Sequence, residues 1–329
     1  MNTPDTPFTT RRWLRNGHAM TIYAWARGRS FPDLPPVERR LFRVAADTEV
    51  AADCFWQPNR RSRPLLLALH GLESSSDAHY MRGLAAQAVR RGWNAVLLNQ
   101  RNCGGTEHLT PRLYHSGLTS DPVAVLRELV ATDGITAFGI VGYSLGGNVT
   151  LKLAGELGDS EDLPVRAVVA VSPTIDLERC VRAIENRANF PYQWNFVRNL
   201  RARMRRKAEA WPGAFDLAPL RRIWTIRGFD EAYTAPHHGF AGASDYYFKA
   251  SSMRVIDRIR IPALILSAED DPFVPGAQFR EAPVAQNSHI TVRLEPFGGH
   301  CGFVGTNGAG EHYWAEETAA DFLERAFRR

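Results

Sequence analysis

Lysine, cysteine and long apolar runs are all scarce in this sequence. Lysine occurs only at positions 152, 207 and 249, so the formal net charge of +5 rests almost wholly on arginine. The arginines are spread along the chain and accompany no nucleic-acid-binding motif, so we expect no nucleic-acid partner. No apolar run approaches the roughly 20 residues that a membrane-spanning helix needs. The sequence therefore predicts no transmembrane segment.

The four cysteines form no Cys-x-x-Cys pair, and they lie far apart, at positions 54, 103, 180 and 301. Thr10–Arg15 imitates a twin-arginine export signal, but the polar Asn16, Gly17 and His18 follow where such a signal needs an apolar stretch. Without a secretory signal, the widely spaced cysteines indicate reduced thiols and a cytoplasmic protein.

Motifs for metals and nucleotides are also missing. His237 and His238 are adjacent, so their side chains point apart and do not have the spacing of zinc ligands. Gly104 and Gly105 follow a predicted strand without the rest of a dinucleotide fingerprint, and there is no P-loop. We therefore expect no metal and no cofactor.

Short apolar runs alternate with helical patterns along most of the chain. The pattern predicts a hairpin over 37–45 and 49–56, buried strands over 65–69, 95–98 and 137–141, and further strands over 165–171, 263–267 and 290–294. It predicts helices over 77–91, 121–132, 148–156 and 311–327, the second with Asp121 as its N-cap. This alternation is typical of an α/β fold, a mostly parallel sheet with helices on both faces.

Two segments depart from the alternation. Residues 1–36 are rich in Pro and Arg and are expected to form an extended surface arm, interrupted only at 21–26. Residues 176–261 hold many aromatics but no clear buried strand, so we expect a helical cap inserted between two parts of one core, 37–175 and 262–329. The length of 329 residues agrees with one domain that carries an insertion.

A basic amphipathic helix is expected within this cap, around 197–211. Its apolar side holds Val197, Leu200, Met204, Ala208 and Trp211, and its other sides hold Arg198, Arg201, Arg205 and Arg206. Such a helix can pack on its own domain or dock on an anionic membrane. We favour packing and keep peripheral membrane contact as the lesser alternative.

The segment Gly142–Gly147 reads Gly-Tyr-Ser-Leu-Gly-Gly and joins a predicted strand to a predicted helix. A serine at such a junction lies on a sharp, strained turn that projects its hydroxyl from the top of the sheet. Gly142 and Gly146 are then required, because a Cβ at either position would collide with the neighbouring strand and helix. The pattern predicts a nucleophile elbow with Ser144 as the nucleophile.

A serine nucleophile needs a base and an acid, which follow it along the chain in the order Ser, acid, His. His300 follows the last predicted strand in a glycine-rich loop, where the base is expected. The strand 263–267 leads into Glu269, Asp270 and Asp271. We favour Asp271 as the acid, because Pro272 keeps it extended just past the strand, and Asp270 stays as the alternative.

An oxyanion hole needs two backbone N–H groups that point to the developing negative charge. Leu145 N–H is one candidate, because it follows the nucleophile at the start of a helix. Leu72 N–H is the second, in the loop after the strand 65–69. His70 is expected to orient this loop rather than to act as a base.

Beyond the elbow, ordered motifs resemble those of the YheT-like branch (AB hydrolase 4) of the α/β-hydrolases. They are Asn16-Gly17-His18 with Thr21, His70–Glu73, Arg101–Gly105, Tyr114–Gly117 with Asp121, Gly142–Asn148, Asp245–Tyr247, Asp270–Phe273 and Gly298–Phe303. Departures occur at Asn102, where the family usually has Gly, and at Ala19-Met20, where it has Leu-Gln. The resemblance implies an ester-cleaving or acyl-transferring enzyme with Ser144, Asp271 and His300 as its triad.

These features predict a serine hydrolase that cleaves small-molecule carboxylic esters of short or medium acyl chains through an acyl-enzyme. Acyl transfer to an alcohol uses the same acyl-enzyme, so it stays open as an alternative. A binding protein that has kept the fold without activity is a further alternative, which the complete set of Ser, Asp and His disfavours.

Overall fold

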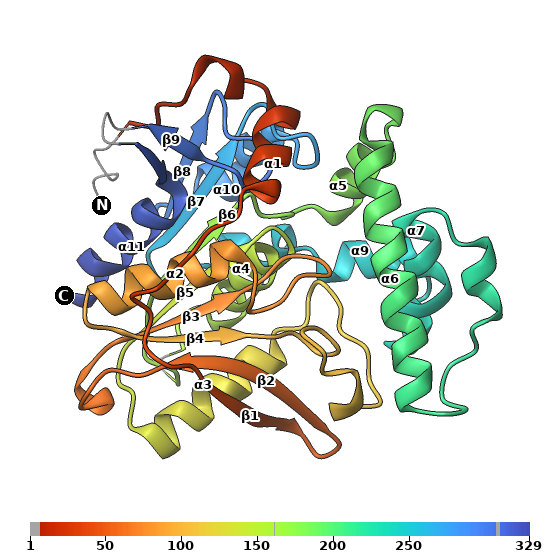
Figure 1. The fold of residues 1–329 in the computed structure, drawn as a ribbon, viewed down its shortest axis with the longest axis horizontal. Coiled ribbons are helices and arrows are strands. Elements are labelled where there is room, and N and C mark those ends of the chain that lie inside the picture. Colours follow the sequence, from red (N-terminus) through yellow and green to blue (C-terminus); the bar gives the residue numbers. More distant parts are fainter. Residues whose placement is uncertain (1–6, 161, 307–309) are drawn as a thin grey trace.

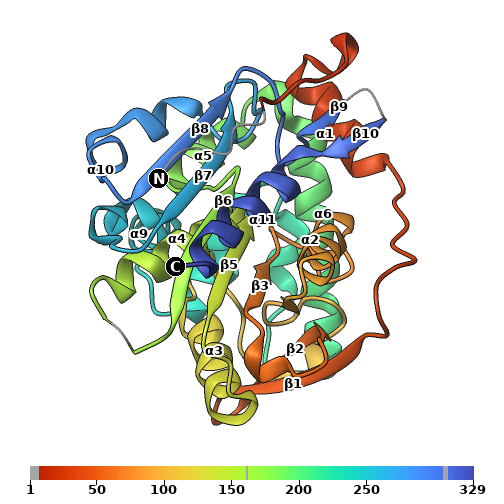
Figure 2. The same cartoon turned by 90° about the vertical axis from the view of Figure 1, so that its left-hand side faces the viewer.

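The computed structural model describes residues 7–160, 162–306 and 310–329. Its main feature is a twisted eight-stranded sheet with the strand order β1-β2-β4-β3-β5-β6-β7-β8 (Figures 1 and 2). The strands are β1 (Glu38–Ala45), β2 (Thr48–Phe55), β3 (Leu65–Leu69), β4 (Asn94–Leu98), β5 (Phe138–Tyr143), β6 (Val165–Val171), β7 (Ala263–Ala268) and β8 (Ile290–Glu295). Strands β1, β2 and β4 pair antiparallel, and β4, β3, β5, β6, β7 and β8 pair parallel, as the apolar runs predicted.

Helices cover both faces of this sheet. The helices are α1 (Gly17–Ala26), α2 (His79–Arg90), α3 (Ser120–Asp133), α4 (Leu145–Leu157), α5 (Leu177–Ile184), α6 (Phe190–Ala210), α7 (Ile226–Phe229), α8 (Ala235–His237), α9 (Ala243–Ala250), α10 (Ala282–Ala285) and α11 (Trp314–Phe327). Helices α2 and α11 pack on one face, and Figure 2 shows α11 lying in front of β5 and β6. Helices α3 and α4 pack on the other face. The fold is therefore that of an α/β-hydrolase.

The five residues of β3 are all buried, as expected for a strand with helices on both sides. Leu69, at the end of β3, pairs with Leu98 of β4 and with Gly142 of β5, and Tyr143 pairs with Val171 of β6. The carboxyl ends of these strands therefore meet at one edge of the sheet. Ligands bind at this edge in open α/β sheets.

Helices α5 to α9 lie between β6 and β7 and form a separate lobe, seen at the right of Figure 1. The longest of them, α6, begins at Phe190, seven residues before the start that we predicted, and Pro191 stands in its first turn. An arginine and a lysine of this helix, Arg203 and Lys207, are buried, which its sequence pattern did not indicate. We call residues 176–261 the insertion.

The segment before β1 is not an extended arm throughout. Residues 1–6 of the predicted arm lie outside the described residues, but Gly17–Ala26 form helix α1, four residues longer than the interruption that we predicted. Asn16 caps this helix, because its side chain accepts a hydrogen bond from the Ala19 N–H at 3.0 Å. The backbone of α1 also approaches Asp270 so closely that a Cβ on Gly17 would lie 1.7 Å from the Asp270 carbonyl oxygen.

One further predicted boundary and one predicted role were wrong. Residues 311–313 are the short strand β10, which pairs with β9 (Val304–Thr306), so α11 begins at Trp314. Asp121 does not cap α3, whose N-cap is Thr119. Instead its carboxylate accepts two hydrogen bonds of 2.6 Å from the buried Arg101 guanidinium, because a buried arginine requires a charged partner.

Candidate active site

Ser144 lies at the sharp turn between β5 and α4. Its backbone has φ +53° and ψ −115°, a conformation that L-residues rarely adopt. A Cβ on Gly142 would lie 2.1 Å from the Gly146 carbonyl oxygen, and one on Gly146 would lie 2.3 Å from the Leu69 carbonyl oxygen. Glycine is thus required at both positions, as the sequence predicted.

The structure brings Ser144, His300 and Asp271 together from three separate elements. Ser144 Oγ lies 2.9 Å from His300 Nε2, and His300 Nδ1 lies 2.9 Å from Asp271 Oδ2. The Asp271 carboxylate also accepts hydrogen bonds from the N–H groups of Phe273 and Val274, at 2.8 and 3.0 Å. Its side chain has no exposed surface, so solvent screens the interaction between the carboxylate and the imidazole only weakly.

Electrostatics at His300 suit a base that takes up a proton. Burial by itself lowers the pKa of His300, but the neighbouring Asp271 carboxylate outweighs this effect and raises the pKa well above its ordinary value. An imidazolium formed at His300 is therefore stabilised. The same carboxylate orients the ring so that Nε2 faces Ser144.

Asp270 has a different position from Asp271. Its Oδ1 accepts a hydrogen bond of 2.9 Å from the Gly299 N–H, in the loop that carries His300. Burial raises the pKa of Asp270, and the adjacent Asp271 charge acts in the same direction. Asp270 thus fastens the backbone of the His300 loop, while Asp271 contacts the imidazole.

Leu72 and Leu145, the two predicted oxyanion donors, line one pocket with Ser144 and His300. Leu145 is the first residue of α4, so its N–H belongs to the first helical turn, where N–H groups have no intrahelical partner. The loop around Leu72 is fixed on both sides, because the Gly71 and Glu73 N–H groups donate to the hydroxyls of Tyr80 and Tyr114.

His70 holds the same loop from beneath. Its Nε2 accepts a hydrogen bond from the Gln100 N–H at 3.1 Å, so its Nδ1 carries the proton and donates to the Gly71 carbonyl oxygen at 2.7 Å. Burial lowers the pKa of His70 to about 4, which keeps the ring neutral. It orients the loop, as its position in the sequence indicated.

The pocket beside Ser144 extends into the insertion, and we call it the Ser144 pocket. Its empty volume is about 760 Å³, including the part open to solvent. Apolar side chains from several insertion helices form much of its wall, among them Leu177, Val181, Ile184, Phe196, Leu200 and Phe229. One end of the pocket thus holds the Ser144 hydroxyl, and the apolar part of its wall suits an apolar chain.

Comparison with known proteins identifies the family. The sequence profile of the alpha/beta hydrolase family matches residues 65–323. The Escherichia coli protein named "Putative esterase YheT" is 38% identical over 276 residues, which cover 82% of this chain and 80% of that protein. The chain belongs to the YheT-like branch of the α/β-hydrolases. The resemblance found in the sequence is thereby confirmed.

More distant relatives of this α/β-hydrolase agree with the assignment. The Mus musculus protein named "Phospholipase ABHD3" is 26% identical over 324 residues, which cover 94% of this chain and 76% of that protein. A solved structure of the Pyrococcus furiosus esterase Pf2001 matches with a TM-score of 0.59 over 91% of this chain and 95% of that chain. At 17% identity, this second likeness shows the fold alone.

Thr21 of this YheT-like protein is a site residue that reasoning from the sequence alone did not assign to a role. From α1, its Oγ1 accepts a hydrogen bond of 2.8 Å from the His300 N–H, although the two residues are 279 positions apart. A Cβ on Gly299 would lie 2.7 Å from the same Oγ1, so the glycine permits this close approach. The only sequence signal was the presence of Thr21 among the family motifs.

Charged groups at the wall of the Ser144 pocket were also missed. Arg203 of α6 lies with its Nε 2.7 Å from Glu73 Oε1, and both side chains are buried. Asp230 accepts hydrogen bonds of 2.7 Å from the hydroxyls of Thr234 and Tyr247, and burial raises its pKa to about 6. Long-range pairs of this kind leave no periodic pattern in a sequence.

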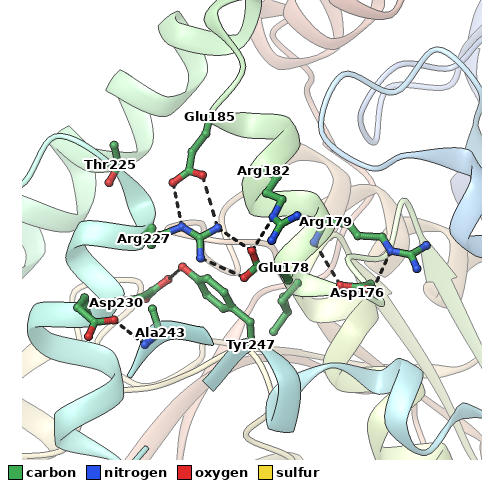
Figure 3. Close-up of polar contacts among 12 residues, drawn as sticks. Asp176, Glu178, Arg179, Arg182, Glu185, Thr225, Arg227, Asp230, Ala243 and Tyr247 are labelled. Atoms are coloured by element: carbon green, nitrogen blue, oxygen red, sulfur yellow. Dashed lines mark hydrogen bonds and ion pairs between the residues drawn. The ribbon is translucent and has the colours of Figure 1, made fainter. Parts of the chain in front are cut away.

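Arg227 ties the insertion helices together around this pocket (Figure 3). Its guanidinium donates to Glu178 of α5 at 3.0 and 3.1 Å and to Glu185 at 3.3 Å, as the dashed lines in Figure 3 show. Helix α5, which supplies Leu177, Val181 and Ile184 to the pocket wall, is thereby fixed to the segment that follows α6.

Three of the four cysteines are poorly suited to act as nucleophiles. All four cysteines are free, and three of them are buried. Burial raises the pKa of Cys54 to about 12 and raises the pKa of Cys103 and Cys180 as well. Their thiols therefore stay protonated and weakly nucleophilic at neutral pH.

Proposed function

We propose that this protein is a serine hydrolase that cleaves carboxylic esters of short or medium acyl chains. The observation that carries the proposal is the 2.9 Å contact between Ser144 Oγ, on a strained strand-to-helix turn, and His300 Nε2, with Asp271 behind the imidazole. The names of relatives, an esterase and a phospholipase, support ester chemistry.

In the proposed reaction, Ser144 Oγ attacks the ester carbonyl carbon while its proton passes to His300 Nε2. The Leu72 and Leu145 N–H groups stabilise the oxyanion of the tetrahedral intermediate. His300 then donates the proton to the leaving alkoxide, and the acyl group stays on Ser144. Water, deprotonated by His300, attacks the acyl-enzyme, and the carboxylic acid leaves as Ser144 regains its proton. The Asp271 carboxylate stabilises the imidazolium.

We propose that the insertion acts as a cap that binds the acyl chain. Its helices supply the apolar wall of the Ser144 pocket, which supports a substrate with an uncharged hydrocarbon part. The division into a core of 37–175 and 262–329 with a cap of 176–261 is supported by the position of α5–α9 between β6 and β7.

Among the described residues, no helix is long and apolar enough to span a bilayer. The free cysteines support the cytoplasmic setting that we expect.

Labelling with a fluorophosphonate probe, followed by an ester panel from acetate to palmitate, tests this function. We expect the protein to be labelled and Ser144→Ala to stay unlabelled, with the highest kcat/KM on short or medium acyl chains. An unlabelled protein that hydrolyses none of the esters would contradict the proposal. Adding ethanol separates the two fates of the acyl-enzyme, because ethyl ester formation would identify an acyltransferase.

A further inference from the structure

Helix α6 has two opposite faces with different surroundings. Phe196, Leu200 and Arg203 lie on the inner face and line the Ser144 pocket. Residues at the complementary helical spacing, Phe190, Trp194, Arg198, Arg201 and Arg205, lie on the outer face. The helix is therefore one wall between the pocket and the exterior of the lobe.

The outer face of α6 borders a shallow groove, which we call the outer groove. Its lining consists of Phe190, Trp194, Val197, Arg198, Arg201, Arg205 and Trp224. Phe190, Trp194 and Trp224 keep 63%, 49% and 65% of their surface exposed. Three exposed aromatic rings in one groove are unusual on a protein surface that contacts only water.

Arginines are interleaved with these rings. The Arg198 guanidinium lies 5.0 Å from the centre of the Trp194 ring, and the Arg201 guanidinium lies 5.3 Å from the Trp224 ring. Among the described residues that line the outer groove, none carries a carboxylate. Aromatic rings and cations on one helix face favour the boundary between lipid headgroups and acyl chains, where the rings enter and the cations meet phosphates.

We propose that the outer groove docks this protein on an anionic phospholipid membrane. A second copy of the chain is a poorer occupant, because a symmetric contact through the same groove would place arginines against arginines. The sequence pattern favoured packing of α6 over docking. In the structure the two are compatible, because the inner face of α6 packs on the lobe and the outer face stays exposed. The consequence for esters rests on the proposed function: a docked protein holds the Ser144 pocket one helix away from membrane-borne esters.

Vesicle co-sedimentation with the full chain tests the docking. We expect binding to phosphatidylcholine vesicles that contain about a quarter phosphatidylglycerol, weak binding to pure phosphatidylcholine, and release at high salt. The triple variant Arg198→Gln/Arg201→Gln/Arg205→Gln is expected to lose roughly a hundredfold in partition coefficient, since each arginine near an anionic surface contributes about fivefold. Trp194→Gln/Trp224→Gln is expected to weaken binding at every salt concentration.

A matched control is present on α9, where Phe248 is 57% exposed and the Arg254 guanidinium lies 4.4 Å from its ring. Phe248→Gln/Arg254→Gln removes an equivalent pair outside the groove and is expected to bind vesicles like the unaltered protein. Three results would each overturn the proposal: no binding to anionic vesicles, equal binding by the triple variant, or an equal loss in the control. A dimer that the groove variants dissociate would also overturn it, by assigning the groove to a second copy.

Hydrolysis of a soluble ester by the same proteins keeps this proposal separate from the proposed function. The groove residues touch no reacting atom, so the triple variant is expected to keep its kcat/KM on a soluble acetate ester and to lose activity only on vesicle-borne esters. A protein that binds vesicles but cleaves no ester would contradict the proposed function and leave the docking intact.

Discussion

The carboxyl edge of the sheet and the insertion beside it hold their functional groups by different means. At the sheet edge, the backbone determines the positions: Ser144, Ser172 and Cys301 all have positive φ, and main-chain N–H groups hold Asp270 and Asp271. In the insertion, the pocket wall depends on side chains such as Arg203 and Arg227, which join residues distant in the chain. The difference indicates that the groups at the sheet edge tolerate few substitutions, whereas the shape of the pocket can be altered by substituting single side chains.

Removing the nucleophile is the largest predicted effect on the sheet edge. In the proposed reaction Ser144 supplies the oxygen that forms the acyl-enzyme, so we expect Ser144→Ala to lower kcat about a millionfold. Steady-state kinetics on a soluble acetate ester measure the loss, and an unchanged melting temperature shows that the fold is retained. Turnover within tenfold of the unaltered protein would exclude Ser144 as the nucleophile.

Removing the charge of Asp271 should reduce activity by about ten-thousandfold, because the imidazole loses both its orientation and the stabilisation of its protonated form. In the proposed reaction the neutral form of His300 is the base, so we expect activity to rise with pH through the pKa of His300. Since the Asp271 carboxylate raises that pKa, Asp271→Asn should move the acidic limb of the kcat/KM profile to lower pH. Asp270→Asn is the matched control, and an equal shift in it would disprove the assignment.

Thr21 tests how firmly the His300 loop must be held. Thr21→Val keeps the shape of the side chain but removes the acceptor for the His300 N–H, so we expect kcat to fall roughly 10- to 100-fold with little change in KM. Thr21→Ser restores the oxygen and should recover most of the rate. If Ser and Val behave alike, the hydrogen bond does not position the base.

Substitutions in the insertion should change the preference among ester substrates and leave the rate of the chemical step unchanged. Val181→Phe narrows the Ser144 pocket from α5, so kcat/KM for an octanoate ester should fall about tenfold while that for an acetate ester stays within about twofold. The ratio between the two esters is the readout, which makes the acetate ester an internal control. Equal losses on both esters would indicate damage to the sheet edge instead.

The smallest predicted effect is on the free energy of unfolding. Arg227→Met removes the ion pairs that join α5 to the following segment, and we expect a loss of about 1–2 kcal/mol in the free energy of unfolding. Arg182→Met is the matched control, because its pair with the same Glu178 is largely exposed and contributes only a few tenths of a kcal/mol, ~0.3. Denaturant unfolding measures both, and equal losses would refute a special role for Arg227.

Reasoning from the sequence worked where local rules determine the structure. The apolar runs placed β6 at its observed bounds, and the glycines around Ser144 predicted a turn that the observed contacts explain. It failed where distant groups compete with a local rule. In the sequence, Asp121 before Pro122 resembles a helix cap, yet α3 begins at Ser120 and the carboxylate of Asp121 pairs with the buried Arg101. Similarly, Thr21 lies on a short helix whose sequence does not indicate that it contacts a loop 279 residues away.

The contact between Thr21 and His300 also has a consequence for biosynthesis. The turn of residues 142–147 is synthesised well before residues 298–303, which supply His300 and its loop. That loop is held by α1, which is made before both segments and gains this partner only after residues 298–303 have been made. Under the proposed function, a nascent chain that stops short of residue 298 displays Ser144 without its base, so a reactive serine forms only after residues 298–303 have been made.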